Sequence, residues 1–303
     1  MLSVAEAPVI RTEALTKRYG RRRGIEDVTF EVRRGEVFGF LGPNGAGKTT
    51  TMRTLLDFLR PTSGRAEVFG LDSRAGSVEI HRHLGYLPGE LALWDRMRGE
   101  DCLRFLASLR GGVPRDRVGA LSDRLGADLD ARIGSLSHGN KQKLGVIQAF
   151  MHDPQLLVLD EPTGALDPLV QHEVHGLIRE AGAAGRTVFL SSHILPEVEA
   201  LCDRVGIIRG GRLVAVEHIA SLKERALRRL EIRFAGPVPS EEFRALDGVR
   251  DLTVDDGILR CTVAGTLDRV IKAAARHTVV NVISEEPSLE EIFLDFYGES
   301  RAP

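Results

Sequence analysis

The sequence predicts an α/β core with an inserted helical subdomain, followed by a small α+β domain, and three observations support this prediction. Short β-branched or apolar runs alternate with helical patterns from Val9 to about Val216, which is typical of a sheet covered by helices. A stretch at about 80–151 is mostly helical by pattern. After about Ser221 a charged helical linker leads to a second set of short strands. The predicted domains are therefore 1–220 and 221–303.

Composition limits the kind of protein this can be. The chain has 303 residues, 43% of them apolar and 28% charged, which is typical of a folded globular protein. Its net charge of −2 gives no overall attraction to nucleic acid, and none is expected as a partner. No uncharged apolar run approaches the roughly 20 residues of a membrane span, and the N-terminus lacks the pattern of a signal peptide. Three scattered cysteines without metal spacing fit a cytoplasmic location: Cys102, Cys202 and Cys261.

Continuously apolar runs predict the central strands of the core. Such strands are expected to be buried on both faces of the sheet, and they are Val37–Leu41, Leu156–Leu159, Val188–Ser191 and Val205–Ile208. The residues Arg209–Arg212 then predict a hairpin turn that leads to a strand at Leu213–Val216.

The second domain has its own order of elements. Its pattern predicts strands and helices in the order β-α-β-β-α-β with one further helix, which matches a ferredoxin-like split unit. The predicted segments are Leu230–Phe234, a helix from Ser240, Val249–Val254, Leu259–Val263, a helix from Leu267, Val279–Ile283 and a final helix Leu289–Tyr297.

A phosphate-binding loop follows the first buried strand. The residues GPNGAGKT fit the pattern G-x-x-x-x-G-K-[ST] and lie between a strand and a helical pattern. The alternative is a glycine-rich turn that binds no ligand, and this context disfavours it. Backbone N–H groups and the positive end of the following helix can hold phosphates there. Lys48 is expected to contact the outer phosphates and Thr49 to ligate Mg²⁺. The loop residues expected to bind nucleotide are Gly42, Pro43, Asn44, Gly45, Ala46, Gly47, Lys48, Thr49 and Thr50. Kinases, GTPases and motor ATPases share this pattern.

Two adjacent carboxylates end the apolar strand Leu156–Leu159. A buried pair would be costly without a cation, so Asp160 is expected to hold Mg²⁺ through water. Glu161, on the opposite side of an extended backbone, is expected to act as the general base that polarises the attacking water. The alternative is a strand end that only reaches solvent.

Two further polar residues follow the later strands. Asp167 precedes Pro168 and predicts a helix N-cap, which can be its only role. His193 comes just after the strand Val188–Ser191, so it emerges at the sheet edge where ligands bind in open α/β folds. A single histidine is usually structural, but this one lies at the edge of the predicted site.

These motifs, in this order, resemble the ABC ATPase family across at least Val9 to Val216, and the core is expected to be a P-loop NTPase. The resemblance implies that Tyr19 stacks on adenine, that the loop ending at Asp167 contacts a second subunit, and that His193 is the switch histidine. The segment LSHGN at 136–140 is similar to the signature LSGGQ. In the family the signature of one subunit completes the ATP site of the other, through Ser137 and Gly139. The resemblance therefore implies a head-to-tail ATPase dimer, which is expected to be a homodimer.

Two departures from the family pattern stand out. His138 and Asn140 replace the second glycine and the glutamine of the signature, although the Asn140 amide can still contact nucleotide or the neighbouring loop. In GYLPGE, Gly89 stands where the family has a glutamine linked to Mg²⁺, which leaves Glu90 as the nearest polar side chain. Whether Glu90 compensates for Gly89 is left open by the sequence.

The segment LPGE, the spacing in LSHGNKQKLG and the ending PSLEEIFLDFYG resemble the drug and antibiotic exporter branch of the family. This resemblance implies an ATP-hydrolysing subunit at the cytoplasmic face of the membrane, which drives a permease encoded on another chain. The segment Leu87–Trp94 is the expected docking surface, with ordinary subdomain core as the alternative. The alternative function is a soluble ABC ATPase in iron–sulfur assembly or on ribosomes or DNA. The second domain is expected to be regulatory, by binding an effector or by stabilising the dimer.

Overall fold

The computed structural model describes residues 7–20, 22–225 and 228–285 and divides the chain into two compact units. The first unit is Met1–Val216 and the second is Glu217–Pro303, so the division falls between Val216 and Glu217 rather than between 220 and 221. Among the described residues, no helix has the length and apolar character that crossing a bilayer requires.

A six-stranded sheet forms the centre of the first unit, with the strand order β10-β9-β3-β8-β7-β6. The neighbours from β9 to β6 pair in parallel, and β3, β7 and β8 are buried along their whole length, as their continuously apolar sequences predict. The strands are β3 (Val37–Leu41), β6 (Leu84–Leu87), β7 (Leu156–Asp160), β8 (Thr187–Ser192), β9 (Arg204–Arg209) and β10 (Arg212–His218).

The stretch at 80–151 is less uniformly helical than its pattern indicates. It contains β6, which pairs in parallel with β7 from Leu84 opposite Leu156 to Leu87 opposite Leu159. Four apolar residues cannot be distinguished from a buried helical turn by periodicity, and the pairing partner lies far along the chain. The helices around β6 are α2 (Ser77–Arg82), α3 (Gly99–Ser108), α4 (Arg115–Leu125), the 3₁₀ turn Ile133–Ser135 and α5 (His138–Phe150).

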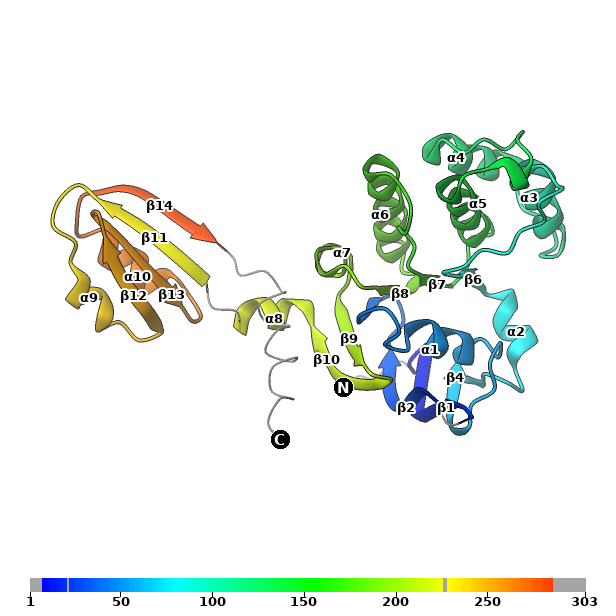
Figure 1. Ribbon diagram of the computed structural model, residues 1–303, viewed down its shortest axis with the longest axis horizontal. Coiled ribbons are helices and arrows are strands. Elements are labelled where there is room, and N and C mark those ends of the chain that lie inside the picture. The colour runs from blue at the N-terminus through cyan, green and yellow to red at the C-terminus, as the bar shows by residue number, and fades with distance from the viewer. Residues whose placement is uncertain (1–6, 21, 226–227, 286–303) are drawn as a thin grey trace, which may run out of the picture. The chain divides into compact units, whose positions relative to one another are not determined.

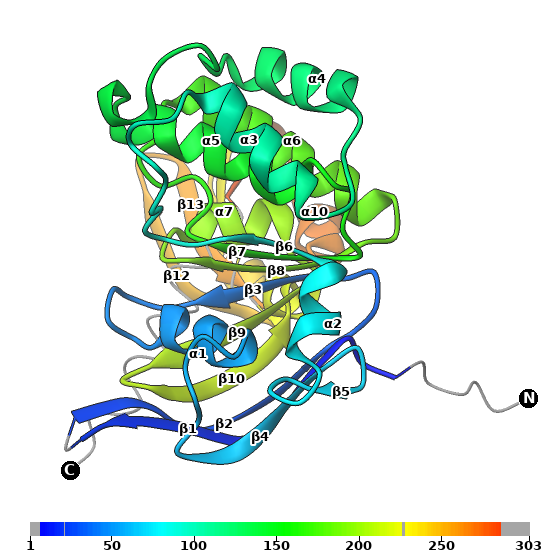
Figure 2. The same ribbon diagram turned by 90° about the vertical axis from the view of Figure 1, so that its right-hand side faces the viewer.

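A second, antiparallel sheet was not singled out in the sequence. Its strand order is β2-β1-β4-β5, and α1 (Lys48–Leu55) contacts β2 and β4 of this sheet and β7 of the central one (Figure 2). Its strands are β1 (Ile10–Tyr19), β2 (Arg22–Val32), β4 (Ser63–Val68) and β5 (Leu71–Asp72). On the central sheet, α5 contacts β6, α6 (Pro168–Ala183) contacts β8, and α7 (Leu195–Leu201) contacts β3 and β8. The phosphate-loop helix α1 is therefore held between two sheets.

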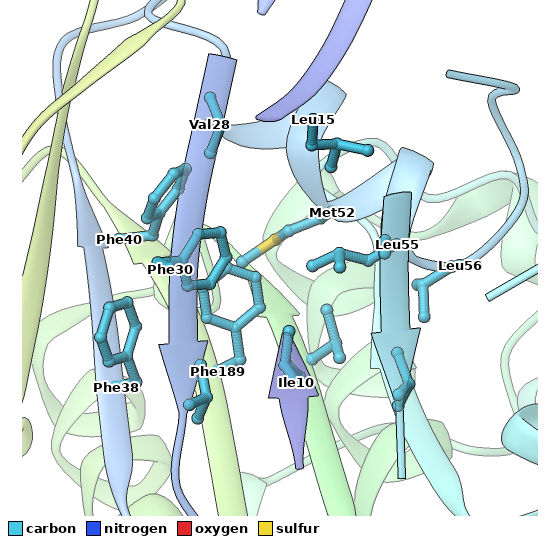
Figure 3. Close-up of a cluster of buried hydrophobic side chains, with 14 of the residues drawn as sticks. Ile10, Leu15, Val28, Phe30, Phe38, Phe40, Met52, Leu55, Leu56 and Phe189 are labelled. Carbon is cyan, nitrogen blue, oxygen red and sulfur yellow. The ribbon is translucent and has the colours of Figure 1, made fainter. Parts of the chain in front are cut away.

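Aromatic side chains fill the space between these sheets (Figure 3). Phe30 of β2 stacks on Phe38 and Phe40 of β3, with ring centroids 5.6 and 5.4 Å apart, and lies 5.7 Å from Phe189 of β8. Met52 of α1 is fully buried in the same cluster. Burial of one such side chain stabilises the fold by about 1.5–3 kcal/mol, so this cluster fixes α1 firmly beneath the loop that precedes it.

The second unit begins with α8 (Ile219–Arg225) and contains the predicted β-α-β-β-α-β order (Figure 1). The strand order is β12-β13-β11-β14, all pairs are antiparallel, and the unit has a buried core of its own around Ile232, Phe243 and Leu259. The elements are β11 (Arg228–Phe234), α9 (Ser240–Arg244), β12 (Val249–Asp255), β13 (Ile258–Val263), α10 (Asp268–Ala274) and β14 (Val279–Glu285). The predicted helix Leu289–Tyr297 lies outside the described residues.

Candidate functional site

A surface depression of about 270 Å³ collects most of the predicted loop residues. The residues 42–47 connect β3 to α1, and Gly47 directly before the helix has a φ of 112°. Residues other than glycine rarely adopt this backbone conformation. Gly42 and Pro43 do not line the depression. The lining residues are Tyr19, Arg23, Gly24, Asn44, Gly45, Ala46, Gly47, Lys48, Thr49, Thr50 and Glu161.

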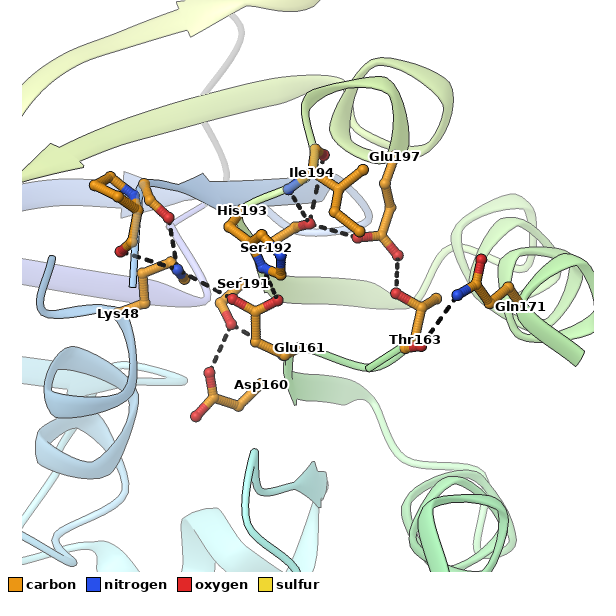
Figure 4. Close-up of polar contacts among 12 residues, drawn as sticks. Lys48, Asp160, Glu161, Thr163, Gln171, Ser191, Ser192, His193, Ile194 and Glu197 are labelled. Atoms are coloured by element: carbon orange, nitrogen blue, oxygen red, sulfur yellow. Dashed lines mark hydrogen bonds and ion pairs between the residues drawn. The ribbon is translucent and has the colours of Figure 1, made fainter. Parts of the chain in front are cut away.

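Lys48 is the buried cation of this depression, with 5% of its surface exposed. Its Nζ donates to the carbonyl oxygen of Gly42 at 2.6 Å and lies 3.0 Å from Oε1 of Glu161 (Figure 4). The ammonium group is therefore held between the loop backbone and the carboxylate of Glu161, which directly follows β7. A phosphate that enters the depression would compete with Glu161 for this ammonium group.

Asp160 is a buried carboxylate with one oxygen left without a hydrogen-bond donor in the described part of the chain. It is completely buried, its Oδ1 accepts a hydrogen bond of 2.6 Å from Ser191 Oγ, and its Oδ2 has no partner within the described structure. A buried carboxylate oxygen without a donor is costly unless a cation or water meets it. Together with the Thr49 hydroxyl at the lining of the depression, Asp160 fits Mg²⁺, which binds through one or two protein oxygens, water and phosphate.

Glu161 does not continue the extended backbone of β7, which corrects the geometry expected from the sequence. Its φ is 52°, and β7 ends one residue earlier at Asp160. Its backbone N–H donates to Ser191 Oγ at 3.0 Å, and this turn directs the carboxylate towards Lys48 and His193 (Figure 4). A left-handed conformation costs a non-glycine residue about 1–2 kcal/mol, so the surrounding hydrogen bonds must maintain it.

His193 contacts the same carboxylate from the other side. Its Nδ1 lies 2.8 Å from Glu161 Oε2, and the side chain is half exposed. The residue follows β8 directly, so the parallel pairing of β7 and β8 brings it beside Glu161 from 32 positions away. The predicted residues Lys48, Glu161 and His193 thus form one connected group.

Tyr19 lies at the rim of the depression with 47% of its surface exposed. The Nζ atom of Lys17 is 5.5 Å from the centre of the Tyr19 ring. An exposed ring beside the phosphate loop offers a flat apolar face on which a base can stack. Arg23 and Gly24, which also line this rim, were missed in the sequence, where only the basic run at 21–23 pointed to them.

The signature segment and Asp167 do not line this depression. Ser137 caps α5 by accepting a hydrogen bond from the Asn140 N–H at 3.3 Å, and Gly139 follows in the first turn of that helix. Asp167 caps α6 through the N–H groups of Leu169 and Val170 at 3.1 and 3.0 Å. Asp167 therefore has the cap that its sequence predicts, Ser137 caps its helix in the same way, and within one chain neither residue lines the depression.

Gly89 lies directly beside the candidate metal ligand. A Cβ atom at this position would be 3.1 Å from Asp160 Oδ2, whereas the neighbouring Glu90 is exposed. No pairing of the Glu90 side chain with Asp160 is among the contacts of the described residues. Gly89 therefore packs against Asp160 and has no side chain that could bind a metal ion there.

Two buried polar residues near Glu161 were not found from the sequence. Gln142 of α5 is 2% exposed and donates to the carbonyl oxygens of Glu161 and Pro162 at 3.4 and 3.3 Å. Glu197 of α7 is 5% exposed and accepts hydrogen bonds from three segments of the chain. Burial alone would raise the pKa of the Glu197 carboxyl, but the hydrogen bonds from His175, Ser192 and Thr163 outweigh it and lower the pKa.

Comparison with known proteins places these residues in a family. Residues 25–164 match the family described as ABC transporter. The chain is 34% identical over 303 residues to the bacitracin transport ATP-binding protein BcrA of Bacillus licheniformis, with 96% of this chain and 97% of the relative covered. It is 33% identical over 300 residues to a fluoroquinolones export ATP-binding protein of Mycobacterium tuberculosis, with 96% and 93% covered.

Solved structures share the fold of the first unit. The structure described as the ATP binding subunit of an ABC transporter has a TM-score of 0.64 and 30% identity, and the match covers 71% of this chain and 92% of that one. A dimeric bacterial ABC transporter cassette has the same TM-score at 18% identity, with 69% and 98% covered. The P-loop core predicted from the sequence is therefore confirmed.

Proposed function

The chain belongs to the ABC transporter family of ATP-binding proteins and hydrolyses ATP, and from this premise we propose that it powers a permease on a separate chain that exports drugs or antibiotics. The observation that supports this most directly is the depression that brings Tyr19, the phosphate loop and Glu161 together. The relatives that match along almost the whole chain are named for bacitracin transport and fluoroquinolone export, which supports the class of cargo.

The phosphates of ATP would lie on the loop, with Lys48 against the outer phosphates and the Tyr19 ring against the base. Thr49 and Asp160 would hold Mg²⁺, which neutralises the charge that develops on the phosphates during hydrolysis. Glu161 accepts the proton of the attacking water, and His193 holds the second oxygen of this carboxylate at 2.8 Å. The positions of Lys48 and His193 on either side of Glu161 support this assignment.

A second copy of the chain would complete the site. The cap at Ser137 leaves the start of α5 outside the depression of its own chain, which supports a head-to-tail arrangement in which the segment 137–140 meets the nucleotide of the other copy. A related cassette of the same fold is dimeric. Asp167, at the start of α6, would then lie in the loop between the two subunits.

The permease would dock on a hollow of about 260 Å³ beside β6. Its lining is largely apolar and includes Phe58, Leu91, Leu93 and Trp94, of which Phe58 and Trp94 are half exposed. The exposed Trp94 ring meets Phe105 edge to face at 5.4 Å. Exposed aromatic side chains around a hollow are typical of a surface that binds another protein. Docking here would place the chain at the cytoplasmic face of the membrane.

The substitution Glu161→Gln tests the mechanism. It preserves the shape of the side chain but removes the proton acceptor, so ATP binding should persist while turnover falls by about 100-fold or more. ATP affinity is measured by direct titration, hydrolysis by phosphate release, and dimer formation by light scattering with ATP and Mg²⁺. We expect the variant to accumulate as an ATP-bound dimer. Turnover close to that of the unchanged protein would refute Glu161 as the base.

A further inference from the structure

Glu197 is a buried carboxylate that receives hydrogen bonds from three separate segments, and those from Thr163 and Ser192 are drawn in Figure 4. Thr163 Oγ1 donates to its Oε1 at 2.8 Å, and Ser192 Oγ donates to its Oε2 at 2.5 Å. The His175 Nε2 atom lies 3.1 Å from Oε1. A carboxylate is the side chain that can accept from this many donors at once, because it has two oxygens and no proton of its own when ionised.

Two of the three segments carry candidate catalytic residues. Thr163 lies two residues after Glu161, and Ser192 directly precedes His193. His175 lies on α6, the helix that Asp167 begins. One side chain therefore connects the loop after β7, the end of β8 and helix α6.

The opposite side of the same loop is also held. Gln142 donates to the carbonyl oxygens of Glu161 and Pro162, and Ser191 Oγ links the Glu161 N–H to Asp160. Glu161 nevertheless keeps a left-handed backbone, which is maintained only where its surroundings determine it strongly. Without the Glu197 carboxylate, the hydrogen bonds that link Thr163 to Ser192 through one side chain are lost.

We propose that Glu197 is a positioning residue for hydrolysis. By binding Thr163 and Ser192 with one carboxylate, it keeps Glu161 Oε2 at 2.8 Å from His193 Nδ1. Glu197 touches neither Glu161 nor His193 in the hydrogen bonds of the described residues, so it acts through the two loops. The inference rests on the proposed role of Glu161 as the base.

The substitution Glu197→Gln tests this proposal. The amide keeps one acceptor oxygen and replaces the other with an NH2 group, so one of the two hydroxyl groups must change from donor to acceptor. The negative charge that strengthens these hydrogen bonds is also lost. We expect kcat to fall about tenfold or more, while KM and the directly titrated ATP affinity stay within about twofold. Unchanged kcat, or a rise in KM with unchanged kcat, would overturn the proposal.

A matched pair on α6 provides the control. His175→Asn removes one hydrogen bond to Glu197 and should lower kcat with little change in ATP affinity. His172→Asn makes the same chemical change on the exposed side of this helix and should leave both values as they are. Equal effects of the two substitutions would contradict a specific role of the Glu197 contacts.

A double-mutant cycle separates positioning from a general loss of structure. If Glu197 acts through Glu161, the double variant Glu161→Gln/Glu197→Gln should hydrolyse ATP in single-turnover experiments as slowly as Glu161→Gln alone. A further tenfold loss would show that Glu197 acts independently, and the proposal would be wrong. Normal turnover of Glu161→Gln by itself would instead refute the base assignment, whatever Glu197→Gln does.

Smaller changes keep the test valid if Glu197→Gln does not fold. Thr163→Val and Ser192→Ala each remove one hydroxyl donor and leave the carboxylate in place. Each should show the same pattern, a lower kcat at retained ATP affinity. Normal kcat in both variants would exclude the positioning role.

Discussion

His152 shows how strongly one partly buried side chain can differ from its behaviour in water. Its Nε2 lies 3.1 Å from the carbonyl oxygen of Leu84, while its Nδ1 is buried and has no partner. Burial, with the nearby charge of Arg110 as the next cause, lowers the pKa of His152 to about 4. A proton on Nδ1 would have no acceptor, which is the physical reason why the imidazole stays neutral.

This pKa predicts a specific dependence of stability on pH. The unfolded chain binds a proton at His152 below pH about 6.5, whereas the folded protein binds it only below about 4, so stability falls as the pH falls from 6.5 towards 4. His152→Gln should show a smaller drop in thermal midpoint between pH 7 and pH 5, measured by calorimetry. His172→Gln, at an exposed position, is the control. An equal drop in all three proteins would contradict the prediction.

Helix α5 and strand β6 are packed so closely that their contact depends on a residue without a side chain. A Cβ atom on Gly85 would lie 2.1 Å from the backbone oxygen of Ala149. Real atoms do not approach this closely, so any larger residue must push α5 away from β6. This contact fixes the helix that begins with the signature segment against the central sheet.

The substitution Gly85→Ala should therefore destabilise the first unit. Overpacking of this kind costs about 1–3 kcal/mol, which corresponds to a fall of several degrees in the thermal midpoint. Gly119→Ala is the matched control, because a Cβ atom there meets nothing within 4 Å and alanine favours a helix by up to about 1 kcal/mol. Calorimetry that ranks Gly119→Ala as the less stable variant would contradict this picture of the packing.

On the scale of the whole molecule, the chain consists of two units with separate cores. The aromatic cluster around Phe30 belongs to the first unit and the cluster around Phe243 to the second. The nucleotide depression is lined entirely by residues of the first unit. The proposed nucleotide site therefore uses no side chain of the second unit among the described residues.

Ending the chain after Arg225 tests this separation. The shortened protein should keep its ATP affinity and unfold as one unit, because its core and its nucleotide site remain complete. A regulatory second unit would show itself as a changed rate of hydrolysis or a changed dimer equilibrium with ATP, measured by phosphate release and light scattering. Loss of ATP binding in a folded shortened protein would contradict separate units.

Local patterns predicted much of this architecture. The buried strands and the hairpin at Arg209–Arg212 follow from short runs of sequence, and so does the β-α-β-β-α-β order of the second unit. Strand β6 was missed because its four apolar residues acquire their strand conformation by pairing with β7. Long-range pairing of this kind leaves little trace in a single sequence.

The sequence by itself determined the chemical groups of the site, since Lys48, Thr49, Asp160 and Glu161 belong to short motifs at the ends of predicted strands. Only the tertiary structure decided that Glu161 is left-handed and that Gln142 and Glu197 hold its loop. The reason is physical: a motif is a local property of the chain, whereas the hydrogen bonds of a buried side chain depend on segments that folding brings together.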